Sequence, residues 1–129
     1  MPTATYVLDQ PAPAATPIPG VAHVTWAGHD DGLQSLSLWR QLLAPGCATP
    51  PHSHPVDEIV LCTGGRGEIR IGDTVHAFGP NQTVVLPANV PHQIFSVGEV
   101  PLETTAVIAA TPAPVHLPDG SPLELPWRS

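Results

Sequence analysis

The sequence contains no lysine, few charged residues, two cysteines and no long apolar run, and each shortage excludes a class of protein. Without lysine, catalysis through a Schiff base on a side-chain amine is impossible. Only 12% of the 129 residues are charged and 42% are hydrophobic, so the chain is expected to fold, and its length indicates one domain. The net charge of -7 argues against nucleic acid or an anionic membrane surface as a partner.

The two cysteines, Cys47 and Cys62, are separated by a spacing that fits neither a C-x-x-C redox motif nor a cysteine zinc site. We expect them to be buried free thiols. The longest apolar runs fall far short of the roughly 20 residues of a membrane span. The N-terminus also lacks the basic start and apolar stretch of a signal peptide, so a cytoplasmic protein with no membrane partner is expected.

The frequent residues are turn formers, with 18 prolines and 11 glycines at short intervals that leave no window for a long helix. Between them lie short runs rich in β-branched residues, which predict an all-β barrel or sandwich with strands paired antiparallel in sequential order. The expected strands fall in the ranges 21–28, 33–43, 57–62, 67–71, 74–78, 82–86, 92–97 and 102–110.

Composition divides the chain into three parts. Residues 1–20 are rich in proline and alanine and are expected to form an extended or partly disordered arm. Residues 21–110 carry the strands of the barrel. Residues 111–129 hold too much proline for a strand ladder yet include Leu123, Leu125 and Trp127, so this tail is expected to pack on the barrel or on a partner subunit.

Three histidines and a glutamate form a pattern typical of a metal site. Alternate side chains of a strand share a face, so His52 and His54 are expected to point the same way. Glu58 opens the next apolar run, and His92 follows a proline turn and starts another strand. Three imidazoles and a carboxylate suit one divalent ion of iron, manganese, nickel, copper or zinc, with positions left open for water or substrate. The alternative is that the three histidines are ordinary polar residues in loops. It is the weaker explanation, because all members of a metal-binding set occur together.

These residues resemble the two sequence motifs of the cupin superfamily. The first motif, G-x5-H-x-H-x3-E-x6-G, is matched at every fixed position by Gly46, His52, His54, Glu58 and Gly65. The second, G-x5-P-x-G-x2-H-x3-N, corresponds to Asn81, Pro87, Asn89, His92 and Ser96. Asparagine replaces both glycines of the second motif, and it is the residue other than glycine that best tolerates left-handed backbone.

The resemblance implies a cupin-type antiparallel β-barrel, that is, a double-stranded β-helix or jelly roll of six to eight strands. It also implies a metal bound by His52, His54, Glu58 and His92, a small-molecule substrate and a homodimer. It assigns no other catalytic residue.

Other residues allow more than one interpretation. Arg40 is either the anchor of a substrate carboxylate or an outward-facing residue, and Gln82 and Glu103 are placed at the barrel interior by strand parity. Cys62 is expected to face the interior. The histidines outside the motifs are interpreted as surface or loop residues, and the tryptophans as core or interface residues. These are His23, His29, His76 and His116, and Trp26, Trp39 and Trp127.

Three functions fit this pattern. The first is a dioxygenase-like oxidoreductase that uses a redox-active metal on an enol, diketone or aromatic substrate. The second is an isomerase, lyase or cyclase in which the metal is a Lewis acid and a nearby base moves a proton. The third is a non-catalytic module that binds a small ligand. An interior lined by Val60, Val84, Leu86 and Ile94 is apolar, which suits an aromatic or ketonic molecule better than a free sugar.

Overall fold

The computed structural model describes residues 5–125, and almost all of its regular structure is β-strand. A 3-10 helix, His29–Asp31, is the helical element of this part of the chain, and no helix in it is long or apolar enough to cross a membrane. The strands are β1 Ala14–Ala15, β2 Val21–Ala27, β3 Ser37–Leu43, β4 Glu58–Gly64, β5 Gly67–Ile71, β6 Thr74–Phe78, β7 Thr83–Leu86, β8 Gln93–Ser96 and β9 Leu102–Ile108. The all-β prediction is confirmed, since each expected run contains one strand from β2 to β9. The short strand β1 was not expected.

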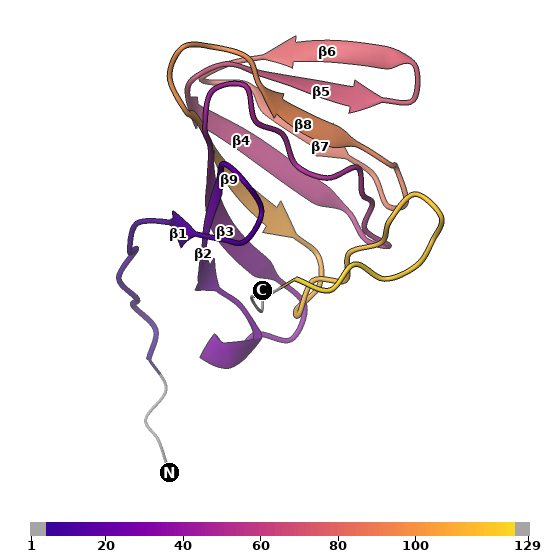
Figure 1. Cartoon of the computed structure of the whole chain (residues 1–129). Helices are drawn as coiled ribbons and strands as arrows, with labels where there is room; N and C mark the ends of the chain where they lie inside the picture. Colours follow the sequence, from indigo (N-terminus) through magenta and orange to yellow (C-terminus); the bar gives the residue numbers. More distant parts are fainter. Residues whose placement is uncertain (1–4, 126–129) are drawn as a thin grey trace.

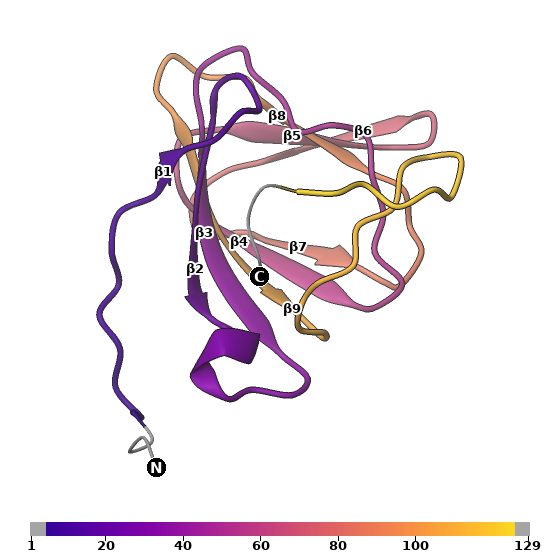
Figure 2. The ribbon, with the colours of Figure 1, turned by 60° about the horizontal axis from the view of Figure 1, so that its bottom comes forward.

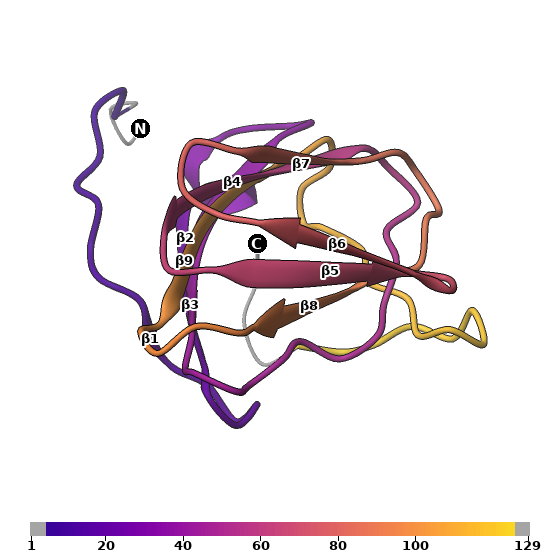
Figure 3. The same cartoon turned by 90° about the horizontal axis from the view of Figure 1, so that it is seen from above.

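The strands form two antiparallel sheets that face each other (Figures 1 and 3). The larger sheet has the order β1-β2-β3-β9-β4-β7, and the smaller has the order β6-β5-β8. The predicted sequential pairing is correct for β2–β3 and β5–β6 but wrong elsewhere. Strand β9 lies between β3 and β4, and β8 pairs with β5. Because the chain passes from one sheet to the other, both sheets can bury their apolar faces against each other.

Inward and outward side chains alternate along these strands and build the core between the sheets. In β4, Glu58, Val60 and Cys62 are buried while Ile59 and Leu61 are exposed. The residues predicted to line an apolar interior, Val60, Val84, Leu86 and Ile94, are all buried. They pack with the fully buried residues Leu43, Leu102 and Ile108. Each such side chain contributes about 1.5–3 kcal/mol through burial, so the core does not depend on the metal ligands.

Asparagine occupies left-handed backbone at the two positions where the second cupin motif has glycine. Asn81 has φ 69° and Asn89 has φ 65°, which confirms that these turns keep the conformation that glycine would adopt. The Asn89 N–H donates a hydrogen bond of 2.7 Å to the carbonyl of His54. This turn therefore ties the segment before His92 to the segment that carries the other two histidines.

Replacing Asn89 with valine is expected to lower the free energy of unfolding by about 1–2 kcal/mol, because a β-branched residue is strained at positive φ. Asn89→Gly is the matched control, since it also loses the side chain but has no strain at this φ. Denaturant unfolding of the metal-free protein would measure both. Equal destabilisation by valine and glycine would show that the asparagine side chain, and not the backbone conformation, matters at this turn.

Strand β1 and the described part of the C-terminal tail pack against the barrel. Strand β1 pairs with the start of β2, whereas residues 5–10 are exposed. The C-terminal segment lies across the open end of the barrel, between the two sheets (Figure 2). Two backbone hydrogen bonds of 2.9 Å hold it there, between Ser53 and His116. Leu123 and Leu125 line the interior cavity, and Trp127 lies outside the described residues.

Candidate metal centre

The fold brings together the four residues that the sequence singles out. His52 and His54 precede β4, Glu58 is the first residue of that strand, and His92 precedes β8. His52 and His92 exchange two backbone hydrogen bonds, of 3.0 and 2.8 Å, which places their rings 4.3 Å apart. One ring nitrogen from each of the three histidines lies within 4.8 Å of the others. These three residues could hold a metal ion.

Glu58 completes the cluster from the floor of the cavity. Its Oε1 lies 3.5 Å from His54 Nε2 and 3.6 Å from His92 Nε2. Burial raises the pKa of Glu58 to about 8 and lowers the pKa of His54 and of His92 to about 4. At neutral pH the metal-free cluster therefore consists of a protonated carboxyl and neutral imidazoles, and a cation would displace the proton of the carboxyl.

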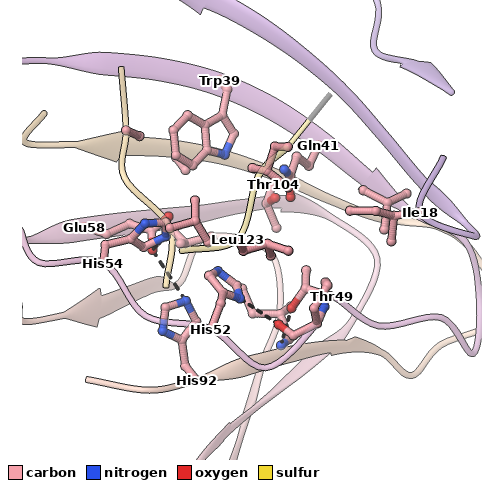
Figure 4. Close-up of a pocket in the computed structure, with 18 of the residues that line it drawn as sticks. Ile18, Trp39, Gln41, Thr49, His52, His54, Glu58, His92, Thr104 and Leu123 are labelled. Atoms are coloured by element: carbon pink, nitrogen blue, oxygen red, sulfur yellow. Dashed lines mark hydrogen bonds and ion pairs between the residues drawn. The ribbon is translucent and has the colours of Figure 1, made fainter. Parts of the chain in front are cut away.

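The ring orientations fit a cation at the centre of the cluster (Figure 4). Each imidazole has its Nδ1 at hydrogen-bond distance from a backbone carbonyl, so Nδ1 carries the hydrogen and Nε2 presents a lone pair. The acceptors are Pro50 O for His52 (2.7 Å), Pro114 O for His54 (2.7 Å) and Val90 O for His92 (3.0 Å). Within residues 5–125, the buried atoms His54 Nε2 and Glu58 Oε1 have no hydrogen-bond partner. Unpartnered buried atoms are costly, and a cation between them would satisfy both.

A cavity of about 200 Å³ opens beside the cluster. Its walls are mainly apolar and come from the barrel, from Ile18 in the arm and from the tail (Figure 4). The neutral polar residues on its surface are Trp39, Gln41, Thr49 and Thr104. Of the described residues that line the cavity, the titratable ones are those of the histidine and glutamate cluster alone.

The contribution of the tail was only partly predictable from the sequence. The apolar residues predict that the tail packs on the barrel or on a partner subunit. The hydrogen bond from His54 to the Pro114 carbonyl has no sequence signal, because every residue has a carbonyl. Pro112, Ala113 and Val115 also line the cavity. The tail therefore forms part of the wall and supports one of the candidate ligands.

The sequence interpretation placed His23 wrongly. It was expected at the surface or in a loop, but it is 7% exposed and faces inward from β2, in step with Val21. Its Nδ1 lies 3.0 Å from Gln41 Nε2 and its Nε2 lies 3.0 Å from Thr25 Oγ1. Strand parity could have indicated this, since Val21 and His23 share a face.

Of the two interpretations of Arg40, the structure supports the outward-facing residue and not the anchor of a substrate carboxylate. Arg40 lies on the outer face of the larger sheet, where its Nη1 is 2.7 Å from Glu103 Oε1 and its guanidinium lies over the ring of Trp26. Glu103 consequently does not reach the interior either. Gln82 is exposed, and its Oε1 accepts a hydrogen bond from the Gly79 N–H.

The remaining predicted residues lie as follows. Both cysteines are free thiols, as expected, but only Cys62 is buried, and it does not line the cavity. Trp39 is a core residue that also lines the cavity, and His29 and His76 are exposed. His116 lies in the tail, where it pairs with Ser53.

The fold and the cluster together define a cupin, and comparison with known families agrees. Residues 39–108 match the family model described as Cupin_2, Cupin domain, which covers more than half of the chain. The chain belongs to this family. A cupin-like protein from Thermotoga maritima superposes with a TM-score of 0.70 at 20% identity, covering 78% of this chain and 80% of that protein. The polyketide cyclase RemF from Streptomyces resistomycificus gives 0.64 at 19% identity, with coverage of 86% and 71%.

Among curated proteins, the chain is similar to plant auxin-binding proteins. Auxin-binding protein T85 from Nicotiana tabacum is 31% identical over 112 residues, and auxin-binding protein 1 from Arabidopsis thaliana is 29% identical over 110 residues. The matches cover 78% and 77% of this chain, but only 60% and 55% of those relatives. The chain therefore spans little more than half the length of the curated relatives that it matches.

Proposed function

We propose that this chain binds a small, largely apolar organic acid at a divalent metal held by His52, His54, Glu58 and His92. The composition of the cavity carries this proposal. Of its described lining residues, these four are the titratable ones, and all others are apolar or neutral. The metal would be iron, manganese, nickel, copper or zinc, and it would supply positive charge for an acidic oxygen and, if redox-active, electron transfer.

Residues of the chain itself would bind the part of the ligand that does not contact the metal. Apolar side chains such as Val60, Ile94 and Leu123 exclude water and bury a carbon skeleton, at about 25 cal/mol for each Å² removed from water. The backbone carbonyls behind the imidazoles keep Nε2 directed at the cation. The names of the auxin-binding relatives support a small organic ligand for this chain as well.

A second function, a dioxygenase acting on an enol, diketone or aromatic substrate, is favoured by the same lining residues. An oxygenase that incorporates both atoms of dioxygen takes its electrons from the substrate at a redox-active metal. An isomerase, lyase or cyclase needs a side chain that moves a proton. Outside the four candidate ligands, the described wall offers no titratable group for that role. This disfavours the base-assisted alternative.

Calorimetry with zinc-loaded protein would test the proposal, using 3-phenylpropanoate and 3-phenylpropanamide as probes. The two share a skeleton and differ in whether they carry an anionic oxygen. We expect the acid to bind about tenfold or more tightly than the amide, a difference of about 1.4 kcal/mol, and only when zinc is present. Equal affinity for both probes with and without zinc would overturn the proposal.

Oxygen uptake would separate binding from oxygenation. The iron(II)-loaded protein would be mixed with acetylacetone as the diketone and catechol as the aromatic probe. Uptake in proportion to added substrate, absent with zinc, would establish the oxygenase. Tight binding of the acid probe without oxygen uptake would count against the oxygenase.

A further inference from the structure

A row of inward-facing polar residues crosses the larger sheet away from the candidate metal centre. The strand register pairs His23 with Gln41, and Gln41 with Thr104. Thr104 precedes Ile108 by four residues, and Ile108 is paired with Glu58. At about 3.3 Å per residue, the row lies roughly 13 Å along the strands from the position of Glu58. Figure 4 shows Gln41 and Thr104 close together, on the side of the cavity away from Glu58.

Two polar groups of this row lack partners within the described chain. Gln41 uses its Nε2 toward His23, at 3.0 Å, while its Oε1 makes no hydrogen bond to residues 5–125. The hydroxyl of Thr104 makes none to these residues either, although Thr104 is only 4% exposed. Both residues line the cavity. Both atoms are open to the cavity and not sealed in the core, so a ligand group that enters the cavity can replace water as their hydrogen-bond partner.

We propose that Gln41 and Thr104 form a second anchor, which takes a neutral hydroxyl group of the ligand. The inference rests on the proposed function and extends it by naming the ligand class. A hydroxyl can donate to Gln41 Oε1 and accept from the Thr104 hydroxyl at the same time. A charged group here would have no counter-charge nearby, since the titratable side chains of the described wall all belong to the cluster around Glu58, on the other side of the cavity. The ligand is an elongated, mostly apolar organic acid with a hydroxyl at the end remote from its acidic group.

His23 is a positioning residue for this anchor. Burial lowers the pKa of His23 to about 4, so the ring is neutral at neutral pH and one of its nitrogens is an acceptor. Nδ1 accepts from Gln41 Nε2, and Nε2–H donates to Thr25 Oγ1 at 3.0 Å. This arrangement engages the amide nitrogen of Gln41 and leaves Oε1 for the ligand.

The test is the ratio of two dissociation constants measured on the zinc-loaded full chain. The probes are 3-phenylpropanoate and 3-(4-hydroxyphenyl)propanoate, which differ by one hydroxyl at the remote end. The protein is expected to prefer the hydroxylated probe about tenfold, as one satisfied pair of hydrogen bonds implies. Gln41→Leu and Thr104→Val should each bring the ratio close to one.

Thr105→Val is the matched control, because Thr105 is the next residue of β9 and hydrogen-bonds to Arg40 on the outer face. It should leave the ratio unchanged. His23→Phe should lower the ratio, whereas a merely structural role of His23 would weaken both probes equally and leave the ratio unchanged.

Each result has one meaning. A wild-type ratio near one, or a ratio that survives both Gln41→Leu and Thr104→Val, overturns the second anchor and leaves the proposed function standing. Failure of both probes to bind the zinc-loaded protein overturns the proposed function, and the anchor with it.

Discussion

Replacing His54 with alanine is expected to weaken metal binding at least ~100-fold, which exceeds the ~10–100-fold typical of losing only a supporting hydrogen bond behind a ligand. His54 is buried, its Nε2 has no partner among the described residues, and its Nδ1 is fixed by the Pro114 carbonyl. Alanine removes both functions. Competition against a chromophoric zinc chelator would measure the affinity, and elemental analysis would give the metal content per chain.

His76→Ala is the matched control, because His76 is exposed on β6, far from the cluster in the fold. It should bind metal like the wild type. Both variants should remain folded, because the core around Leu43, Leu102 and Ile108 is untouched. Wild-type affinity in a protein lacking both His52 and His54 would refute the ligand assignment.

The proton on Glu58 gives the same assignment an independent readout. Burial raises the pKa of Glu58 to about 8, so the metal-free site holds a proton at pH 7 and loses it as the pH rises through about 8. Zinc binding at pH 7 should therefore release about one proton, and affinity should rise with pH until it levels above that pKa. Calorimetry in two buffers of different ionisation enthalpy would count the protons. In the Glu58→Gln variant, zinc binding should no longer release the proton that Glu58 carries in the wild type.

The local features of this molecule were readable from its sequence because each has a short-range physical cause. Proline and glycine spacing located the strands, and alternation placed Glu58 on the buried face of β4 with Val60. The left-handed turns at Asn81 and Asn89 followed from the tolerance of asparagine for positive φ. The meeting of the three histidines followed from their match to a known motif.

Features that depend on distant pairing were not readable. Strand β9 separates β3 from β4 because closing two sheets around one core outweighs local sequence order. The outward position of Arg40 depends on that pairing, since Glu103 of β9 is its partner.

Deleting residues 111–129 is expected to weaken metal binding ~10–100-fold and to abolish tight binding of the acid probe. The deletion removes the Pro114 carbonyl, which accepts from His54 Nδ1 at 2.7 Å, so the His54 ring loses the contact that fixes its tautomer and direction. It also removes five residues that line the cavity, which opens the site to water. Water weakens the attraction between the metal and an anionic ligand, so the affinity for the acid probe should fall more than the affinity for the metal.

Deleting residues 1–10 is the matched control, since residues 5–10 are exposed and lie away from the cavity. That variant should keep wild-type affinity for zinc and for 3-phenylpropanoate. Thermal unfolding of the metal-free variants would show whether the barrel itself survives each deletion. If the protein without its tail folds and binds the acid probe as tightly as the full chain, then the tail is not part of the site. The affinity for the acid probe is therefore expected to fall more than the affinity for the metal. The tail supports only one candidate metal-binding residue, His54, through a carbonyl, but it supplies a wall of the cavity that would hold the acid probe.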